Sequence, residues 1–435
     1  MPTQPSSAIR GSLPEFEALE TRDLRPLQLF FLAAAVFVVS AAYGSLLPLL
    51  PVWLSEQMPL SNATDVARHV GFLSGAYTAG VLLGAPLWGL MSDRLGQPRI
   101  LIVGLIGYVS SLLILLLVPT VGSLWVIYTL RAGSGLFVAA VVAVVPALVA
   151  AHTPSARRAR RFAWLGAASL LGFLSGPGLN AVANVLAEAL TNGPAPAALQ
   201  IRIVIGLSAF LGASMMLGLA LTLPARDGAP KPDAAESEGR RDDRIAALGW
   251  LSLAVTFALS GFEVGIVLQG ELHVDLSTQQ VALMFAECSL VMLSVNAALF
   301  FTSILDKVPS WRVIAVGSLV GIAGLAILAS HHSHDWMYVG VSLTSAGTGL
   351  VLPVISFLAA GVPRHTLGTT MGWLAAAAGL GQTLGSATGG WLFGAFAQHA
   401  FGWLALPLSV VPILMLLHRQ RWSHVTSMSV TTSGS

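Results

Sequence analysis

Residues 89–99 read GLMSDRLGQPR and residues 302–312 read TSILDKVPSWR, so an acid followed by a base, with an Arg six residues after the acid, recurs after 213 residues. Residues 131–136 (RAGSGL) recur as residues 345–350 (SAGTGL), at an offset of 214. Two matches at nearly one offset predict that the chain contains two copies of one unit. This duplication determines the architecture of the whole chain.

The composition predicts that both copies lie in a lipid bilayer. Hydrophobic residues make up 55% of the 435 residues and charged residues only 10%, whereas a soluble domain has roughly 25% charged residues. The apolar residues fall in blocks of about 20, the helix length that crosses a bilayer core. These blocks lie near 27–50, 70–91, 100–118, 123–150, 162–186, 200–223, 246–270, 278–302, 312–330, 336–361, 370–396 and 400–418. The predicted fold is therefore all-α, with twelve transmembrane helices in two pseudo-symmetric six-helix bundles.

A polar segment at residues 224–245 separates the sixth block from the seventh. Its Pro, Gly and charged residues are typical of a flexible linker. With both termini in the cytoplasm, 19 of the 22 Lys and Arg residues lie on the cytoplasmic side, as the positive-inside rule requires. The predicted organisation is a cytoplasmic tail (1–26), an N-terminal bundle (27–223), a cytoplasmic linker (224–245), a C-terminal bundle (246–418) and a cytoplasmic tail (419–435).

Other classes of function have little support in the sequence. The net charge is +2 and the basic residues belong to short loops, so no nucleic-acid partner is expected. Cys288 is the single cysteine, which excludes a disulfide and a cysteine-rich metal site. The His-rich turn at 331–335 (HHSHD) is predicted to be solvated rather than metal-binding. No metal and no cofactor are predicted, and a membrane enzyme or a sensor is the rival class, without a nucleophile–base pair or a soluble domain to support it.

The motifs resemble those of the major facilitator superfamily, and the resemblance covers nearly the whole chain. The 89–99 loop is similar to the signature loop of that family, and Arg131 with Gly135 is similar to its helix-4 motif. Residues 44–51 (GSLLPLLP) resemble the pattern of the drug:proton antiporter branch, and residues 172–178 (GFLSGPG) resemble a Gly-Pro motif linked to antiporters. The chain departs from these patterns at Pro98, Asn180 and Ala181.

This resemblance implies a secondary active transporter that works by alternating access. The leading prediction is export of a small organic compound, either a drug or an endogenous metabolite, against an inward flow of protons. A proton-coupled importer of a nutrient and an exporter of a siderophore remain as alternatives. The expected partners are the small-molecule substrate, protons and the lipid bilayer, and the expected form is a monomer in a bacterial inner membrane.

The repeated loop motif predicts a conformational latch at the cytoplasmic face. Asp93 can accept backbone N–H bonds at a helix N-terminus. Gly89 allows a neighbouring helix to approach, and Arg94 can pair with an acid across the two halves. A plain basic loop is the alternative. The predicted latch residues are Gly89, Asp93, Arg94, Gly96, Arg99, Asp306 and Lys307.

Three ionisable residues, Arg131, Glu263 and Glu287, lie inside the predicted helices. A charged side chain at a helix centre costs about 2.5–3.5 kcal/mol on the insertion scale, so such residues usually serve a function. Counting from the helix ends places all three in one layer of the outer half of the membrane. Because the two acids and Arg131 belong to different halves, their contacts can depend on how the halves rock. They are the proton-coupling candidates, with a structural ion pair as the alternative.

Further side chains are candidates for lining a substrate cavity, although lipid-facing or core positions are equally compatible with several of them. The Gly-Pro motif in the fifth block indicates close helix packing, and its proline can kink the helix and restrict leakage. Both interpretations of that motif stay open. The motif residues are Gly172, Gly176 and Pro177, and the cavity candidates are Tyr43, Asn180, Asn184, Phe262, Met284, Trp373 and Gln382.

Overall fold

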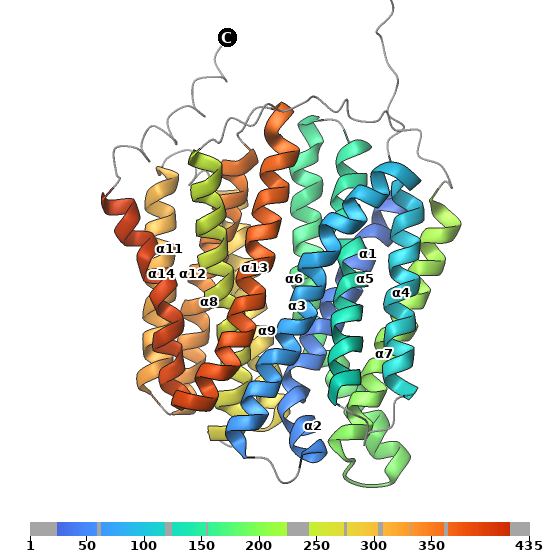
Figure 1. The fold of residues 1–435 in the computed structure, drawn as a ribbon, viewed down its shortest axis with the longest axis vertical. Helices are drawn as coiled ribbons and strands as arrows, with labels where there is room; N and C mark the ends of the chain where they lie inside the picture. The colour runs from blue at the N-terminus through green and yellow to red at the C-terminus, as the bar shows by residue number, and fades with distance from the viewer. Residues whose placement is uncertain are drawn as a thin grey trace, which may run out of the picture.

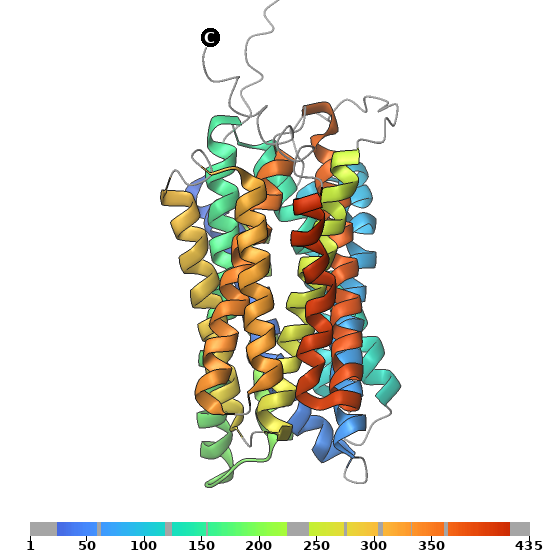
Figure 2. The ribbon, with the colours of Figure 1, turned by 90° about the vertical axis from the view of Figure 1, so that its left-hand side faces the viewer.

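The computed structural model is a bundle of long helices that run along one common axis (Figures 1 and 2). All regular elements in the described part of the chain are helices, so the predicted all-α class is confirmed. The structure describes residues 24–58, 62–117, 124–153, 155–223, 243–273, 276–302, 308–331, 333–360 and 364–417.

The first membrane helix of the first half contains one short stretch of 3-10 helix. Pro48 and Pro51 lie where one short helical segment follows another, and the missing proline N–H groups therefore cost little there. The elements are α1 (Pro26–Leu46), the 3-10 helix η1 (Leu47–Leu49), α2 (Leu50–Gln57), α3 (Ala63–Leu95), α4 (Gln97–Leu117), α5 (Leu124–Ala151), α6 (Ser155–Thr191) and α7 (Ala197–Thr222).

The second half ends in two helices joined by a tight turn. Ala397 begins this turn with φ 48, a left-handed conformation that interrupts the helix. The elements are α8 (Asp243–His273), α9 (Thr278–Phe301), α11 (Ser310–Ser330), α12 (His334–Ala360), α13 (Arg364–Phe396), the 3-10 helix η2 (Ala397–His399) and α14 (Ala400–Leu417).

Eleven apolar stretches in the described residues are long enough to cross a membrane. The last of them, Trp373–Ile413, has 41 residues and would be about 60 Å long as one helix, twice the thickness of a bilayer core. The turn at η2 folds it into α13 and α14, which meet at the lower end of the bundle in Figure 1 and diverge above it on either side of α8. Counting these two helices separately gives the twelve that the sequence predicts.

The repeated RAGSGL and SAGTGL motifs pack in the same way in both halves. Gly135 of α5 lies against the backbone of Tyr77 in α3, with no room for a side chain. Gly349 of α12 lies against Met292 in α9, where an added methyl group would be 3.1 Å from the Met292 Cγ atom. Small residues permit this close approach of helices in membranes. The motif therefore joins the fourth helix to the second in each half. The boundary at residues 224–245 remains a prediction, because residues 224–242 lie outside the described residues.

The two halves meet along two helix pairs, α3 with α13 and α6 with α9. A methyl group on Gly71 of α3 would be 2.6 Å from the Gly390 Cα atom of α13, and one on Gly379 would be 3.1 Å from the Leu82 side chain. These contacts run from the α3 N-terminus to its middle. Further along α3, no atom of the residues that the structure describes lies within 4 Å of a methyl group built on Gly89. The halves are thus in close contact toward one end of the bundle.

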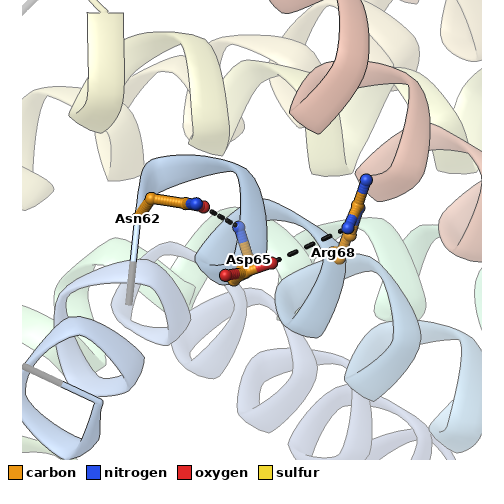
Figure 3. A network of polar contacts seen from close by, with 3 residues as sticks. All are labelled: Asn62, Asp65 and Arg68. Atoms are coloured by element: carbon orange, nitrogen blue, oxygen red, sulfur yellow. Dashed lines mark hydrogen bonds and ion pairs between the residues drawn. The ribbon is translucent and has the colours of Figure 1, made fainter. Parts of the chain in front are cut away.

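That end, which carries the α3 N-terminus, is here called the predicted outer end, and the opposite end is called the predicted cytoplasmic end. At the outer end, Glu56 accepts bonds from the N–H groups of Ala197 and Ala198, both at 3.0 Å, and so fixes α2 to the start of α7. The start of α3 is capped separately (Figure 3). The side chain of Asn62 accepts a 2.9 Å bond from the N–H of Asp65, whose carboxylate lies 3.7 Å from Arg68.

Candidate functional site

Tyr43 and Glu263 join the two halves inside the predicted bilayer. The Tyr43 hydroxyl of α1 donates a hydrogen bond to the Glu263 Oε2 atom of α8 at 3.3 Å. Both side chains are partly buried. The distance is longer than the 2.5–2.7 Å that is usual for a hydroxyl–carboxylate bond. This bond is the direct link between the predicted cavity residue Tyr43 and the predicted coupling acid.

Two aromatic rings connect this contact to Arg131. The ring of Tyr43 stacks on that of Tyr77 in α3, with centroids 5.3 Å apart and an angle of 27°. The Arg131 guanidinium of α5 lies over the Tyr77 ring, 4.6 Å from its centroid. The order across the site is therefore Glu263, Tyr43, Tyr77 and Arg131, with both rings between the opposite charges.

Arg131 forms no ion pair in the described part of the chain. Its side chain is only 6% exposed, and the Nε and Nη2 atoms are buried without a hydrogen-bond partner. The ion pair found among the described residues joins Arg68 to Asp65 at the outer end. The sequence predicted that Arg131, Glu263 and Glu287 share a layer, and in this conformation that layer contains no direct contact between the base and either acid.

Glu287 lies on another pair of helices, within the second half. Its Oε1 atom accepts a short hydrogen bond from the Ser342 hydroxyl of α12, and its Oε2 atom is buried without a partner. The carboxylate is thus held between α9 and α12. Glu263 is hydrogen-bonded to the first half, whereas the hydrogen bond of Glu287 stays within the second half, so Glu263 is the better placed of the two to sense a movement between the halves.

A second aromatic contact between the halves lies beside Tyr43. The rings of Phe173 in α6 and Phe285 in α9 have centroids 5.6 Å apart, and Phe173 is also 5.8 Å from Tyr43. Sequence reasoning missed Phe173, Phe285 and Tyr77 as members of the site. The signal for Phe173 was available, because it lies inside the Gly-Pro motif at 172–178. Tyr77 and Phe285 carry no comparable signal, because aromatic residues are ordinary in membrane helices.

The Gly-Pro motif brings α6 against α1. A methyl group on Gly176 would be 2.6 Å from the carbonyl carbon of Gly44, and Gly172 lies against the backbone of Phe37. Pro177 follows within α6. This glycine packing places Phe173 beside Tyr43, and it is the structural role that the motif performs in this conformation.

Two of the predicted cavity residues belong to the core. Phe262 and Met284 are both 0% exposed, so in this conformation neither presents its side chain to a ligand. Trp373 is 49% exposed and packs against Gly249 in α8. Gln382 is partly buried in α13.

The two asparagines of α6 differ in their surroundings. Asn180 is 5% exposed and neither atom of its amide has a hydrogen-bond partner. Asn184 donates a 2.9 Å bond to Glu188, one turn further along the same helix. Asn180 is the one whose unsatisfied amide leaves it able to bind a polar group.

The predicted latch is described only in part. Gly96 ends α3 with φ 95, a conformation that favours glycine. Arg94 and Arg99 are exposed, and no atom of the described residues lies within 4 Å of a methyl group built on Gly89. The side chain of Asp93 and the residues Asp306 and Lys307 lie outside the described residues.

A helical membrane protein with two halves that meet at a layer of buried ionisable and aromatic residues has the architecture of a secondary transporter. The chain belongs to the Major Facilitator Superfamily, whose family model matches residues 32–360. It is accordingly a membrane transporter and not an enzyme.

The similar proteins include several resistance proteins. The class G tetracycline resistance protein of Vibrio anguillarum is 28% identical over 86% of this chain and 92% of its own length. The class B tetracycline resistance protein of Escherichia coli is 37% identical, but over only 31% of this chain and 32% of its own length. The quinolone resistance protein NorA of Staphylococcus aureus is 22% identical over 90% of this chain and 96% of its own length.

Solved structures share the fold at low identity. The human organic anion transporter MFSD10 (TETRAN) has a TM-score of 0.68 at 18% identity, over 90% of this chain and 100% of that chain. The POT family transporter PepTSo has a TM-score of 0.73 at 13% identity, over 92% of this chain and 99% of that chain.

Proposed function

We propose that this transporter exports a small organic compound in exchange for protons, by alternating access across a bacterial inner membrane. The observation that carries the proposal is the hydrogen bond between Tyr43 and Glu263, which joins the halves at an ionisable group. Similarity to proteins named for tetracycline and quinolone resistance supports an exporter of drug-like compounds. We also propose that the chain acts as a monomer with both termini in the cytoplasm.

Glu263 can link protonation to the position of the halves. An ionised carboxylate is a strong acceptor for the Tyr43 hydroxyl, and a protonated one is a weaker acceptor without charge. The ionised form therefore favours the conformation in which α1 and α8 are in contact. A proton that neutralises Glu263, or a substrate that displaces Tyr43, removes this preference and releases the halves.

The packing of the halves supports assignment of this conformation to the inward-facing state. Glycine contacts hold α3 to α13 from the outer end to the middle, and among the described residues no such contact occurs at Gly89. The end of the first helix, formed by η1 and α2, also packs against α8 and α9. Both features close the outer end. In the opposite state these contacts separate, and Glu263 is exposed to protons from outside.

Glu287 is the second candidate for proton coupling. It carries a buried carboxylate oxygen without a partner, which a bound proton would turn into a donor. Because its partner Ser342 belongs to the same half, the Glu287 site need not change when the halves rock. We therefore assign the larger role to Glu263.

Flux in proteoliposomes with an imposed pH gradient tests the proposal, with tetracycline and a quinolone as substrates. We expect Glu263→Gln to abolish gradient-driven transport and Glu287→Gln to reduce it. Glu188→Gln is the matched control, because Glu188 is an exposed carboxylate near the outer end of α6. Normal gradient-driven transport by both glutamine variants would contradict the proposed coupling.

The direction of transport separates the exporter from its alternatives. Cells that lack the protein should retain an exported compound, whereas they should fail to accumulate an imported nutrient. Retention of a siderophore, with no change for either drug, would favour the siderophore exporter.

A further inference from the structure

The Arg131 side chain carries a positive charge that no ion pair balances in the described part of the chain. It is 6% exposed, and its Nε and Nη2 atoms have no hydrogen-bond partner. An ion buried in a membrane protein without a partner is strongly unfavourable. The Tyr77 ring beneath it offers a cation–π contact, which is weaker than pairing with an anion. The guanidinium therefore has unused capacity to bind.

The groups around Arg131 are hydrogen-bond donors. Tyr77 lies under its guanidinium, Tyr43 stacks on Tyr77, and Tyr108 belongs to α4, which packs along the Arg131 helix α5. Tyr108 of α4 is 3% exposed, and its hydroxyl is buried without a partner. Guanidinium N–H groups and a free hydroxyl together match a ligand that accepts hydrogen bonds and carries a negative charge.

Glu263 and Glu287, the two acids predicted to lie within the membrane, do not pair with Arg131. Glu263 is separated from Arg131 by the stacked rings of Tyr43 and Tyr77. Glu287 is held by Ser342 in the other half. A water molecule can accept hydrogen bonds here, but it leaves the charge unbalanced. An anion can balance the charge, and it comes either from the surrounding aqueous phase or from the transported compound.

We propose that Arg131 and the Tyr108 hydroxyl form a binding site for a compact monovalent anionic group. The group is either the acidic group of an organic substrate or a small inorganic anion such as chloride. The first of these sources, the acidic group of a substrate, rests on the proposed export of organic compounds. In that case the exported compounds belong to the class that carries a carboxylate, an enolate or a phenolate. The small exposure of Arg131 restricts the group that enters to a compact one.

Binding to the purified full-length protein in detergent tests the site without a pH gradient or transport. The probes are sodium chloride against sodium gluconate, and benzoate against the neutral benzamide, with thermal unfolding as the readout. We expect chloride, benzoate or both to raise the melting temperature in a saturable way, whereas gluconate and benzamide should not. Saturation by chloride alone identifies an inorganic anion, and saturation by benzoate alone identifies the acidic group of the substrate.

Variants locate the effect. Arg131→Gln should abolish the response, and Tyr108→Phe should weaken the apparent affinity roughly tenfold through loss of one bond to a charged group. Arg202→Gln, which removes an exposed arginine at the outer end of α7, should respond like the wild type. If Arg131→Gln does not fold, Tyr108→Phe decides the question.

The site is refuted if no probe anion stabilises the wild type, or if the Arg131 and Tyr108 variants respond as Arg202→Gln does. Because the assay needs no flux, failure here leaves the proton-coupled export untouched, and failure of export leaves the binding result untouched.

Discussion

The two halves use the same motif for the same packing but for different chemistry. Arg131 begins the motif in α5, and Ser345 begins it in α12. Both residues are buried, at 6% and 0% exposure. The first half thus buries a base behind tyrosine rings, whereas the second half has a hydroxyl there and carries its acids on α8 and α9. The glycine contacts recur in both halves, whereas the buried base and the buried acids lie in different halves. Protonation of the acids can therefore change the attraction between the halves.

The difference between the halves can be tested by placing a base at position 345, the counterpart of Arg131 in the second half. Ser345→Arg should destabilise the protein by more than about 3 kcal/mol, because an unpaired charge enters a fully buried site without the tyrosine rings that surround Arg131. Thermal unfolding in detergent measures the effect, with the isosteric Ser345→Cys as control. A melting temperature equal to that of the wild type would show that the second half tolerates the same charge.

The two motif glycines should differ in their tolerance of a methyl group. Gly135→Ala should cost about 3 kcal/mol, because the methyl would strike the Tyr77 backbone, and Gly349→Ala about 1 kcal/mol, because much of the contact is with the flexible Met292 side chain. Thermal unfolding of the two variants, each paired with Ala at the open position Gly133 as control, gives the order. A larger loss for Gly349→Ala would contradict the packing.

Tyr43→Phe should reduce gradient-driven transport about tenfold without abolishing it. The change removes one hydrogen bond to a charged group but keeps the ring that stacks on Tyr77. Flux into proteoliposomes measures this, and Tyr128→Phe is the control, because Tyr128 contacts His69 within the first half. Equal activity of the two variants would argue against a role for the Tyr43 hydroxyl.

The smallest effect on transport is expected from a change beside Glu287, whose hydrogen-bond partner Ser342 belongs to the same half. Ser342→Ala removes the hydroxyl that donates to Glu287, but water can replace that donor at a partly exposed carboxylate. Gradient-driven transport should fall about twofold to fivefold. A loss as large as that of Glu263→Gln would transfer the main coupling role to Glu287.

Sequence alone predicted the helices well because length, apolarity and basic loops each constrain them independently. It also predicted which residues are charged within the membrane. It did not predict that two rings separate Arg131 from Glu263, because their arrangement depends on how α1, α3 and α5 cross. Glycine spacing indicated close packing at 172–178, but not which helix would be the partner.

The placement of Phe262 and Met284 shows a further limit. A membrane helix that is apolar all round has no amphipathic stripe to reveal which face meets its neighbours, the lipid or a ligand. Both residues were cavity candidates with a core position as an open alternative, and both lie in the core. Only the packing of the helices distinguishes these faces.

The Tyr43–Glu263 bond is the proposed proton-sensitive link between the halves. Double electron–electron resonance can measure its effect, with spin labels on exposed Asn192 and Asp335 in a Cys288→Ser background. In the wild type, lowering the pH should shift the distance distribution at the outer end toward longer distances. Glu263→Gln should show the longer distances at every pH. A distance distribution that responds to pH equally in both proteins would show that protonation of Glu263 does not control the separation of the halves.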